Sequence, residues 1–394
     1  MRAIVIGAGP IGIAAALGAL ERGIDVTVVE RSEVGASLRT WGATRFFSPL
    51  HMNVTARMRA VLGDALPDGD ALLTGDEYVD RVLLPLVERE PLRGRVRTQA
   101  RVIAIGRRGL TRGDYAGHPL RAEKPFRVML DDDETLEAEV VLDASGGLVV
   151  PRPMGVGGLP VRGESRLARL PIRTLGELHA RRDELRGKRI LVIGDGHSAA
   201  NAISALADDG ATHIVWAVRT PNRRPCEEVA NDPLPERRSI VERANALAEA
   251  PPKHLRVERR AMIESVAPNN GHVVVALTGG RIVETDYIAA FTGYRPDGAF
   301  LSELAVETSP VTEGGGRLYR AISNVTDCLN VPRLSPHDLQ SGEPGFYFIG
   351  SRAYGRARTF LLQTGFQQLE TILDSLTGSQ SHRLTEAARG SGSL

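Results

Sequence analysis

Two stretches of the chain share one pattern of apolar and polar positions. The first is MRAIVIGAGPIGIAAALGALERGIDVTVVE at the start, and the second is KRILVIGDGHSAANAISALADDGATHIVWAVR from residue 188. In each, an apolar run leads through glycines into a small-residue stretch and then into a second apolar run. This order predicts a strand, a Gly-rich turn, a helix and another strand, which together form a βαβ unit. The chain therefore carries two such units.

Other segments extend the alternation of strands and helices. Apolar spacing predicts helices at Asp76–Glu90 and Thr359–Leu376, and strands at Val96–Ile105, Phe126–Leu130, Val140–Leu142, Val273–Leu277 and Tyr287–Phe291. Residues 41–75 and 106–125 read as irregular, and the Ser/Gly-rich end from about Gly378 as disordered. Such alternation indicates an α/β fold with parallel sheets covered by helices.

The first glycine turn has the spacing of a dinucleotide-binding motif. Gly7, Gly9 and Gly12 match G-x-G-x-x-G between strand and helix. They would permit a tight turn, close approach of the backbone to a diphosphate, and close helix packing. The diphosphate would lie at the helix N-terminus, and Glu30 at the end of the second strand would hold ribose hydroxyls. The alternative is a Gly-rich turn before an ordinary helix.

The second turn repeats the motif with Gly194 and Gly196, and with Ala199 at the third position. Its second strand ends at Arg219 instead of a carboxylate, and Arg223 and Arg224 follow. A guanidinium there can pair with a 2′-phosphate, which favours NADPH over NADH. The alternative is that these arginines belong to a solvated surface loop without a ligand. His197, at the helix start, either touches the cofactor or is simply exposed.

Composition narrows the function classes. A chain of 394 residues favours two domains, and 49 basic against 48 acidic side chains argue against nucleic acid or an anionic membrane as partner. We find no signal peptide and no 18-residue apolar run, so we expect a cytoplasmic protein. Cys226 and Cys328 are far apart in sequence and form no close-spaced redox pair. The nine scattered histidines favour a metal-free protein.

Three later segments complete a familiar pattern. VLDASG at 141–146 and AFTGYRP at 290–296 look like strand-to-glycine crossovers, and GFYFIG at 345–350 looks like a late strand returning to a flavin. With the two glycine motifs, they resemble flavin-containing and N-hydroxylating monooxygenases and their thioredoxin-reductase-like relatives, over nearly the whole chain. Ser351 stands where the family usually has Asp, and the long histidine-containing fingerprint of flavin-containing monooxygenases is not recognisable around 146–165.

The resemblance implies two Rossmann-like dinucleotide-binding domains, with the NADPH domain inserted into the FAD domain. We expect the FAD domain at 1–160 and 286–378, the NADPH domain at 161–285 and a disordered tail at 379–394. The helix from Thr359 would direct its N-terminus at the flavin. The predicted cofactor-binding residues are Gly7, Gly9, Pro10, Ile11, Gly12, Glu30, Arg31, Arg39, Arg45, Ser145, Gly146, Gly194, Gly196, His197, Ser198, Arg219, Thr292, Gly293, Gly350, Ser351 and Phe360.

Family position also suggests candidate catalytic groups in the segment 45–53. Asn53 could donate to the flavin or to a peroxide on it, and His51 could shuttle a proton. The alternatives are a turn or a helix N-cap before Val54 for Asn53 and a structural histidine for His51. Tyr354, Arg356 and Gln363 are further pocket candidates, with surface-loop and helix-face positions as their alternatives.

The function implied is an NADPH-dependent FAD monooxygenase that uses molecular oxygen, through a C4a-peroxyflavin, on a small nitrogen- or sulfur-containing substrate. Disulfide reduction would need a nearby cysteine pair. Two alternatives stay open: a reductase that passes electrons to a quinone or a protein, and a redox-sensing binder without turnover. The substrate and the oligomeric state are not identified, and a homodimer is one of the states open to the chain.

Overall fold

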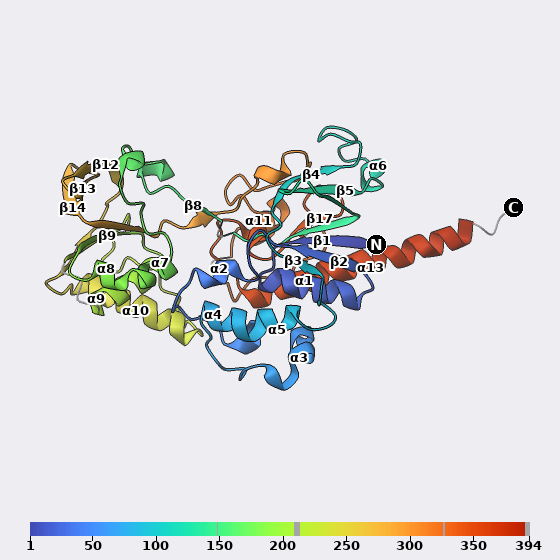
Figure 1. The fold of residues 1–394 in the computed structure, drawn as a ribbon, viewed down its shortest axis with the longest axis horizontal. Coiled ribbons are helices and arrows are strands. Elements are labelled where there is room, and N and C mark those ends of the chain that lie inside the picture. Colours follow the sequence, from blue (N-terminus) through green and yellow to red (C-terminus); the bar gives the residue numbers. More distant parts are fainter. Residues whose placement is uncertain (148, 209–212, 326–327, 391–394) are drawn as a thin grey trace.

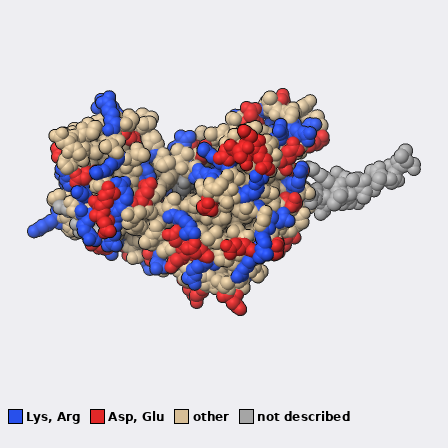
Figure 2. Space-filling view, viewed as in Figure 1, with Lys and Arg blue, Asp and Glu red and all other residues tan. Residues whose placement is uncertain are grey.

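The computed structural model describes residues 1–147, 149–208, 213–325 and 328–390, without the side chains of 379–390. It has two lobes (Figure 1). Each lobe contains a parallel sheet with its own hydrophobic core. On the face shown in Figure 2, basic and acidic side chains are intermingled over both lobes, in line with the formal charge of +1.

The first domain contains a five-stranded parallel sheet in the order β17-β7-β1-β2-β3. Its inner strands are almost wholly buried, as expected for a parallel sheet covered on both faces. A three-stranded antiparallel sheet, β4-β5-β6, accompanies it. The strands are β1 Arg2–Ile6, β2 Asp25–Val29, β3 Val96–Arg97, β4 Val102–Arg107, β5 Phe126–Leu130, β6 Thr135–Ala138, β7 Val140–Asp143 and β17 Phe346–Phe348.

Helices of the first domain flank these sheets. They are α1 Pro10–Glu21, α2 Ala36–Arg39, α3 Ala56–Leu62, α4 Gly75–Tyr78, α5 Leu84–Val87, α6 Pro119–Ala122, α11 Gly316–Ile322, α12 Ser351–Tyr354 and α13 Leu362–Gly390. A π-helical segment, η3 Val79–Leu83, joins α4 to α5, which confirms the helix predicted at 76–90. The short helix η1 Leu50–Met52 precedes α3.

The second domain is built on a four-stranded parallel sheet in the order β11-β10-β9-β15 and an antiparallel sheet, β12-β13-β14. Buried side chains cover both faces of the parallel sheet. Its elements are α7 Leu175–Ala180, α8 Arg182–Leu185, β9 Arg189–Ile193, α9 His197–Asp208, β10 His213–Ala217, α10 Pro235–Glu249, β11 Leu255–Glu258, β12 Ile263–Asn269, β13 His272–Leu277, β14 Arg281–Thr285 and β15 Tyr287–Ala290.

A two-stranded antiparallel ribbon lies where the chain passes between the domains (Figure 1). It pairs β8 Val150–Pro151 with β16 Tyr294–Arg295. Met154 and Val161 already pack in the second core, and β15 pairs with β9. Along the chain, β8 and β16 thus lie between the strands of the two parallel sheets, and the expected domain boundaries after residues 160 and 285 stay predictions.

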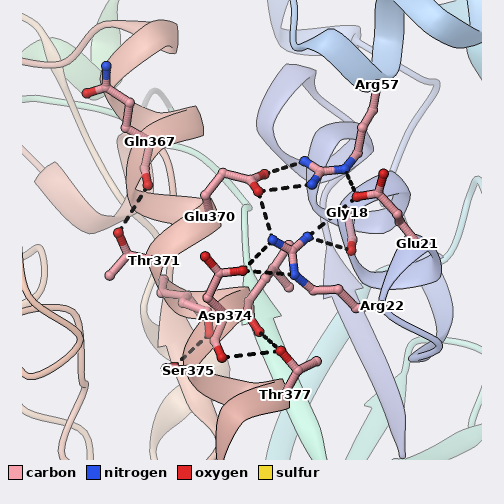
Figure 3. A network of polar contacts seen from close by, with 12 residues as sticks. Gly18, Glu21, Arg22, Arg57, Gln367, Glu370, Thr371, Asp374, Ser375 and Thr377 are labelled. Carbon is pink, nitrogen blue, oxygen red and sulfur yellow. Dashed lines mark hydrogen bonds and ion pairs between the residues drawn. The ribbon is translucent and has the colours of Figure 1, made fainter.

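The helix α13 is held against α1 and α3 by a network of charges (Figure 3). Glu370 accepts hydrogen bonds from Arg22 (2.9 Å) and Arg57 (3.0 Å), and Arg22 also donates to Asp374. A Cβ on Gly18 would lie 2.6 Å from the Leu373 side chain, so glycine permits this close approach. The network fixes α13 against the C-terminal end of α1 and against α3.

Three local expectations differ from the structure. The single strand predicted at Val96–Ile105 is divided into β3 and β4, which belong to different sheets. The region 41–75, expected to be irregular, contains α3, capped by Thr55, and the loop at 106–125 contains α6. The expected disordered end overlaps α13, whose bounds reach Gly390, while 391–394 lie outside the described residues.

Candidate functional site

The first glycine turn is packed tightly on one side. Gly7 has φ +102°, and a Cβ there would lie 2.6 Å from the carbonyl oxygen of Ala144. A Cβ on Gly12 would lie 1.9 Å from the carbonyl oxygen of Gly7. Both positions therefore require glycine, one for backbone conformation and close approach and one for helix packing.

The other side of this turn is open. Nothing lies within 4 Å of a Cβ placed on Gly9, which is the N-cap of α1 and has no side-chain cap. Pro10 occupies the first helical turn, where its missing N–H costs nothing. The free N–H groups and the positive end of the helix therefore face a space that can take a phosphate.

Glu30 follows β2 and closes the turn. One carboxylate oxygen accepts the N–H of Ala8 at 2.9 Å, and the other accepts the N–H of Ser32 at 3.0 Å. These bonds fix the carboxylate beside the glycine turn, where the sequence predicts a ribose contact. Arg31 is exposed next to it.

Ser145 lies beside the same turn and has an unused hydrogen-bonding group. Its Cα is 3.3 Å from the Cβ position of Gly7, and its hydroxyl oxygen is buried without a partner among the described residues. Buried polar atoms without partners are rare and call for a missing donor or acceptor. Gly146 adjoins it with φ +88°, and the Ser351 hydroxyl accepts the N–H of Gly147 at 3.1 Å.

Ile11 links the glycine turn to the late segment of the chain. A Cβ on Gly350 would lie 2.9 Å from the Ile11 side chain, and one on Gly365 would lie 2.8 Å from it. The ring of Phe360 also lies 2.9 Å from the Gly365 position. The end of β17, the start of α13 and the first turn therefore meet at one place.

A buried ion pair beside this place is not foreseen in the sequence analysis. Arg352 donates from Nε to Asp143 at 3.0 Å, and both side chains are almost fully buried. Arg352 also donates to the carbonyl of Glu313 and lies over the ring of Phe348. The pair joins the end of β7 to α12. An acidic residue ending an apolar strand, Asp143, is the signal that could have indicated it.

The second glycine turn repeats the geometry of the first. Gly194 has φ +124°, and its Cβ would lie 2.4 Å from the carbonyl oxygen of Phe291. Nothing lies within 4 Å of a Cβ on Gly196, which precedes α9. The indole N–H of Trp216 donates to the carbonyl of Gly194 at 2.8 Å and so anchors the turn to β10. This turn therefore also offers an open cradle for a phosphate.

Thr292 and Gly293 lie between the second turn and the ribbon. The Thr292 hydroxyl donates to the carbonyl of Arg152 at 2.7 Å, and the N–H of Arg152 donates to the carbonyl of Gly293 at 2.9 Å. Phe291 and Thr292 thus take the same place at the second turn that Ala144 and Ser145 take at the first. The two crossovers predicted from the sequence are equivalent.

Arg219 projects from the end of β10 and is 65% exposed. Its nearest acidic partner is Asp195, 3.9 Å away, which leaves the guanidinium able to bind a ligand. Arg224 instead donates to Glu228 and Glu249 and is used within the domain. Ser198 is exposed at the start of α9. Arg219 is the better candidate for a 2′-phosphate contact.

His197 is where the two domains touch. Its ring lies edge to face with Phe47, with 5.1 Å between the centroids. Desolvation, together with the charges of Arg237 and Arg358, lowers the pKa of His197 to about 4, and the charge of Asp232 opposes this shift. His197 nevertheless keeps an exposed surface. At neutral pH the imidazole is uncharged.

The two candidate catalytic residues lie in different environments. Asn53 is buried; its amide donates to the Ser48 carbonyl at 2.9 Å and its oxygen accepts from the Ser48 hydroxyl at 2.8 Å. His51 is exposed and contacts the carbonyl of Gly69. The N-cap of α3 is Thr55, whereas Asn53 is the C-cap residue of η1. Asn53 closes the loop at 48–53, and the catalytic roles of both residues stay predictions.

Four further candidates have partners within the protein. Arg39 donates to Asp76 and Asp80, and Arg45 donates to the carbonyl of Leu72. Tyr354 is buried and accepts from Gln368, and burial raises its pKa to about 12, while Arg356 donates to Glu313. Gln363 is exposed on α13. Cofactor or substrate contacts by these residues stay predictions.

Both cysteines are buried thiols outside any disulfide. Cys226 packs in the second core, and burial raises the pKa of its thiol to about 12. Cys328 accepts a hydrogen bond from Arg237. The thiols thus form no disulfide. Within the described part of the chain, no cluster of three or more His, Cys, Asp or Glu side chains could hold a metal, and no helix could cross a membrane.

Two glycine turns of matching geometry, one in each domain, define a two-dinucleotide oxidoreductase. The chain belongs to the pyridine nucleotide-disulphide oxidoreductase family, whose profile matches residues 1–337. Its cofactors are FAD and NADPH. The open space at Gly9, the fixed carboxylate of Glu30 and the partnerless hydroxyl of Ser145 fit FAD in the first domain. The open space at Gly196 fits NADPH in the second.

Proteins of the same fold with solved structures are named for different reactions. Bacillithiol disulfide reductase from Bacillus cereus is 17% identical, with 96% of this chain and 100% of that chain covered and a TM-score of 0.67. A mutant flavin monooxygenase from Stenotrophomonas maltophilia is 17% identical (96% and 98% covered, TM-score 0.64). L-lysine 6-monooxygenase from Pseudomonas syringae is 15% identical (96% and 99% covered, TM-score 0.62). No curated protein matches the sequence.

Proposed function

We propose that the protein is an NADPH-dependent FAD monooxygenase that transfers one oxygen atom to a small nitrogen- or sulfur-containing substrate. The observation that carries this proposal is the state of the two cysteines, which are buried, outside any disulfide and placed in different domains. A disulfide reductase with an internal relay needs two thiols that can form a disulfide with each other. Without that relay, an external acceptor has to take the electrons, and oxygen is one.

The side chains of this protein would then bind, orient and exclude water. FAD, when bound, accepts a hydride from NADPH and supplies two electrons to the acceptor. Glu30 would hold its ribose and the α1 N-terminus its diphosphate, while Arg219 would pair with the 2′-phosphate of NADPH. Phe47 and the uncharged His197 would shield the space between the two cofactors from solvent. For this proposal we divide the chain into an FAD domain, residues 1–151 and 294–378, and an NADPH domain, residues 152–293.

A reductase that delivers electrons to a quinone or another small acceptor is the second candidate. The amide of Asn53 is already bonded to Ser48, and His51 is at the surface. The loop that would support oxygen chemistry therefore presents few free polar groups. The likeness to a bacillithiol disulfide reductase is compatible with this reading.

Oxygen labelling separates the two candidates. Purified holoenzyme would turn over NADPH under ¹⁸O₂ with a panel of amines and thioethers, and products would be analysed by mass spectrometry. Incorporation of one ¹⁸O atom per product, with NADPH consumed in proportion, is expected of the monooxygenase. Electron transfer to an added quinone with no label in any product would decide for the reductase. A Gly196→Val protein, which should not bind NADPH, controls for non-enzymatic oxidation.

A further inference from the structure

Four arginines from both domains gather beside the second glycine turn. Arg152 follows β8 and Arg219 follows β10, whereas Arg356 and Arg358 lie between α12 and α13 of the first domain. Arg358 reaches across the domain boundary: its Nη2 is 3.9 Å from an Asp195 oxygen, and its Nη1 is 3.6 Å from Glu227. A residue of the FAD domain therefore faces the NADPH turn.

Asp195 is shared between two of these arginines. Arg219 and Arg358 each approach the same carboxylate oxygen, Oδ1, at 3.9 Å. A separation of 3.9 Å allows an ion pair but is too long for a hydrogen bond. The N–H groups of both arginines can therefore still donate to a ligand. The two guanidinium groups are 65% and 63% exposed, whereas Asp195 is only 17% exposed. One carboxylate oxygen thus lies near two exposed cations.

The cluster carries more positive charge than its neighbours neutralise. Arg356 is paired with Glu313 at 2.9 Å, but Arg152 has no carboxylate within salt-bridge distance among the described residues. Burial lowers the pKa of Arg152, and the charges of Arg356, Arg219 and Arg358 lower it further. Arg152 also lies against Gly293, 3.8 Å from its Cβ position, directly behind the second turn. Like charges brought together in this way favour binding of an anion.

We propose that Arg358 is a phosphate-binding residue of the NADPH site, contributed by the FAD domain. Arg219 and Arg358 would leave Asp195 and donate to phosphate oxygens placed above the open Gly196 cradle, with Arg152 adding charge from behind. NADPH carries phosphate in two places, the diphosphate and the 2′-phosphate, and either can be the contact. Because Arg358 belongs to the other domain, the nucleotide bridges the two domains. The inference rests on NADPH binding and not on the identity of the final acceptor.

An exposed ion pair at 3.9 Å contributes little to stability. Replacing Arg358 should therefore leave the fold and the flavin content unchanged. A structural role would predict the opposite, which makes the two roles separable by experiment.

The test is titration calorimetry of NADP⁺ and NAD⁺ into the FAD-loaded wild type, Arg358→Gln and Arg127→Gln. Arg127 is exposed on β5 in the antiparallel sheet of the first domain and serves as a matched control. Loss of one charge-assisted hydrogen bond should weaken NADP⁺ binding roughly ten- to a hundredfold in Arg358→Gln. Weakening of NADP⁺ alone assigns the contact to the 2′-phosphate, and weakening of both nucleotides assigns it to the diphosphate. Unchanged affinity in Arg358→Gln, with normal binding by the wild type, overturns the inference.

A second variant moves the affinity in the opposite direction, which misfolding cannot do. Asp195→Asn removes the carboxylate that occupies the arginine pair and that would repel a phosphate. NADP⁺ should bind more tightly to this variant than to the wild type. Equal or weaker binding would contradict the proposed position of the phosphate. If the wild type itself fails to bind NADP⁺, the cofactor assignment falls and not the role of Arg358 within it.

Discussion

Phe47 and His197 lie edge to face at 5.1 Å although they belong to different domains. The contact joins the loop before η1 to the first residue of α9, and so connects the flavin side of the molecule with the nucleotide turn. It also helps to explain why His197 stays uncharged, because an aromatic ring replaces water on one side of the imidazole.

The lowered pKa of His197 predicts a pH-dependent stability. Its folded pKa is about 4 against an ordinary value of 6.5, so between these values the unfolded chain binds a proton that the folded protein does not. The free energy of unfolding should therefore fall as the pH falls from about 6.5 to about 4. The free energy of unfolding, measured by urea denaturation at several pH values in this range, should change less with pH in His197→Gln than in the wild type. The exposed His213→Gln variant should keep the wild-type slope, and an unchanged slope in His197→Gln would contradict the prediction.

The open cradles at Gly9 and Gly196 predict two opposite losses. Neither position has an atom within 4 Å of a Cβ, so a valine should fit each folded domain and obstruct only the phosphate. Gly9→Val should be purified without FAD, measured from its absorbance. Gly196→Val should keep FAD and lose NADP⁺ binding.

Gly12→Ala is the matched contrast for these variants. Its methyl group would lie 1.9 Å from the Gly7 carbonyl, so it should lower the melting temperature of the protein itself. Full FAD retention by Gly9→Val would refute the assignment of the first site.

Arg219 predicts a preference for NADPH. A charge-assisted bond to the 2′-phosphate contributes about 1.5–3 kcal/mol, which corresponds to roughly ten- to a hundredfold in kcat/KM over NADH. Arg219→Ala should reduce this ratio and leave the NADH kinetics nearly unchanged. Arg224→Ala should keep the ratio, because Arg224 is bonded to Glu228 and Glu249. Equal use of both nucleotides by the wild type would argue against the prediction.

Glu370 predicts how α13 is held in place. Burial alone would raise its pKa, but hydrogen bonds from Arg57 and Arg22 outweigh burial and lower the pKa below the ordinary 4.5 (Figure 3). The carboxylate therefore stabilises the fold above this pH and loses that contribution as the pH falls below it. Glu370→Gln should cost about 1–2 kcal/mol at pH 7, allowing for its partial exposure.

The comparison for Glu370→Gln is Asp374→Asn, because the Asp374 side chain is 70% exposed and should contribute less. Urea denaturation at pH 7 measures both variants. Equal stability of Glu370→Gln and the wild type would show that packing alone holds α13.

Features that depend on residues close together in the sequence are the ones that the sequence predicts best. The glycine turns, Glu30 and the two crossovers are local patterns, and the structure brings them together as expected. Arg39 shows the limit: its pairing with Asp76 and Asp80 depends on how α2 packs beside α4, which spacing does not reveal. The sequence predicts one strand at 96–105 where the structure has β3 and β4. The reason is similar, because a short apolar run does not indicate which sheet it joins.

Contacts between the domains were beyond sequence reasoning. Arg358 is one of 49 basic residues, and nothing in its neighbourhood along the chain distinguishes it. Its position opposite Asp195 arises from the packing of segments that lie more than 150 residues apart. The buried pair of Asp143 and Arg352 depends in the same way on β7 and α12 meeting at one sheet edge.

The pairing of β7 with β17 also has a consequence for the order of folding. Val141 pairs with Phe346, so the five-stranded sheet needs a strand that is synthesised near the end of the chain. The strands of the second sheet all lie between Arg189 and Ala290, and its ribbon closes soon afterwards. We therefore expect the nucleotide domain to fold while the chain is still being made. The flavin domain would wait with its apolar edge strand β7 uncovered, which makes a nascent or truncated chain vulnerable to aggregation at that edge.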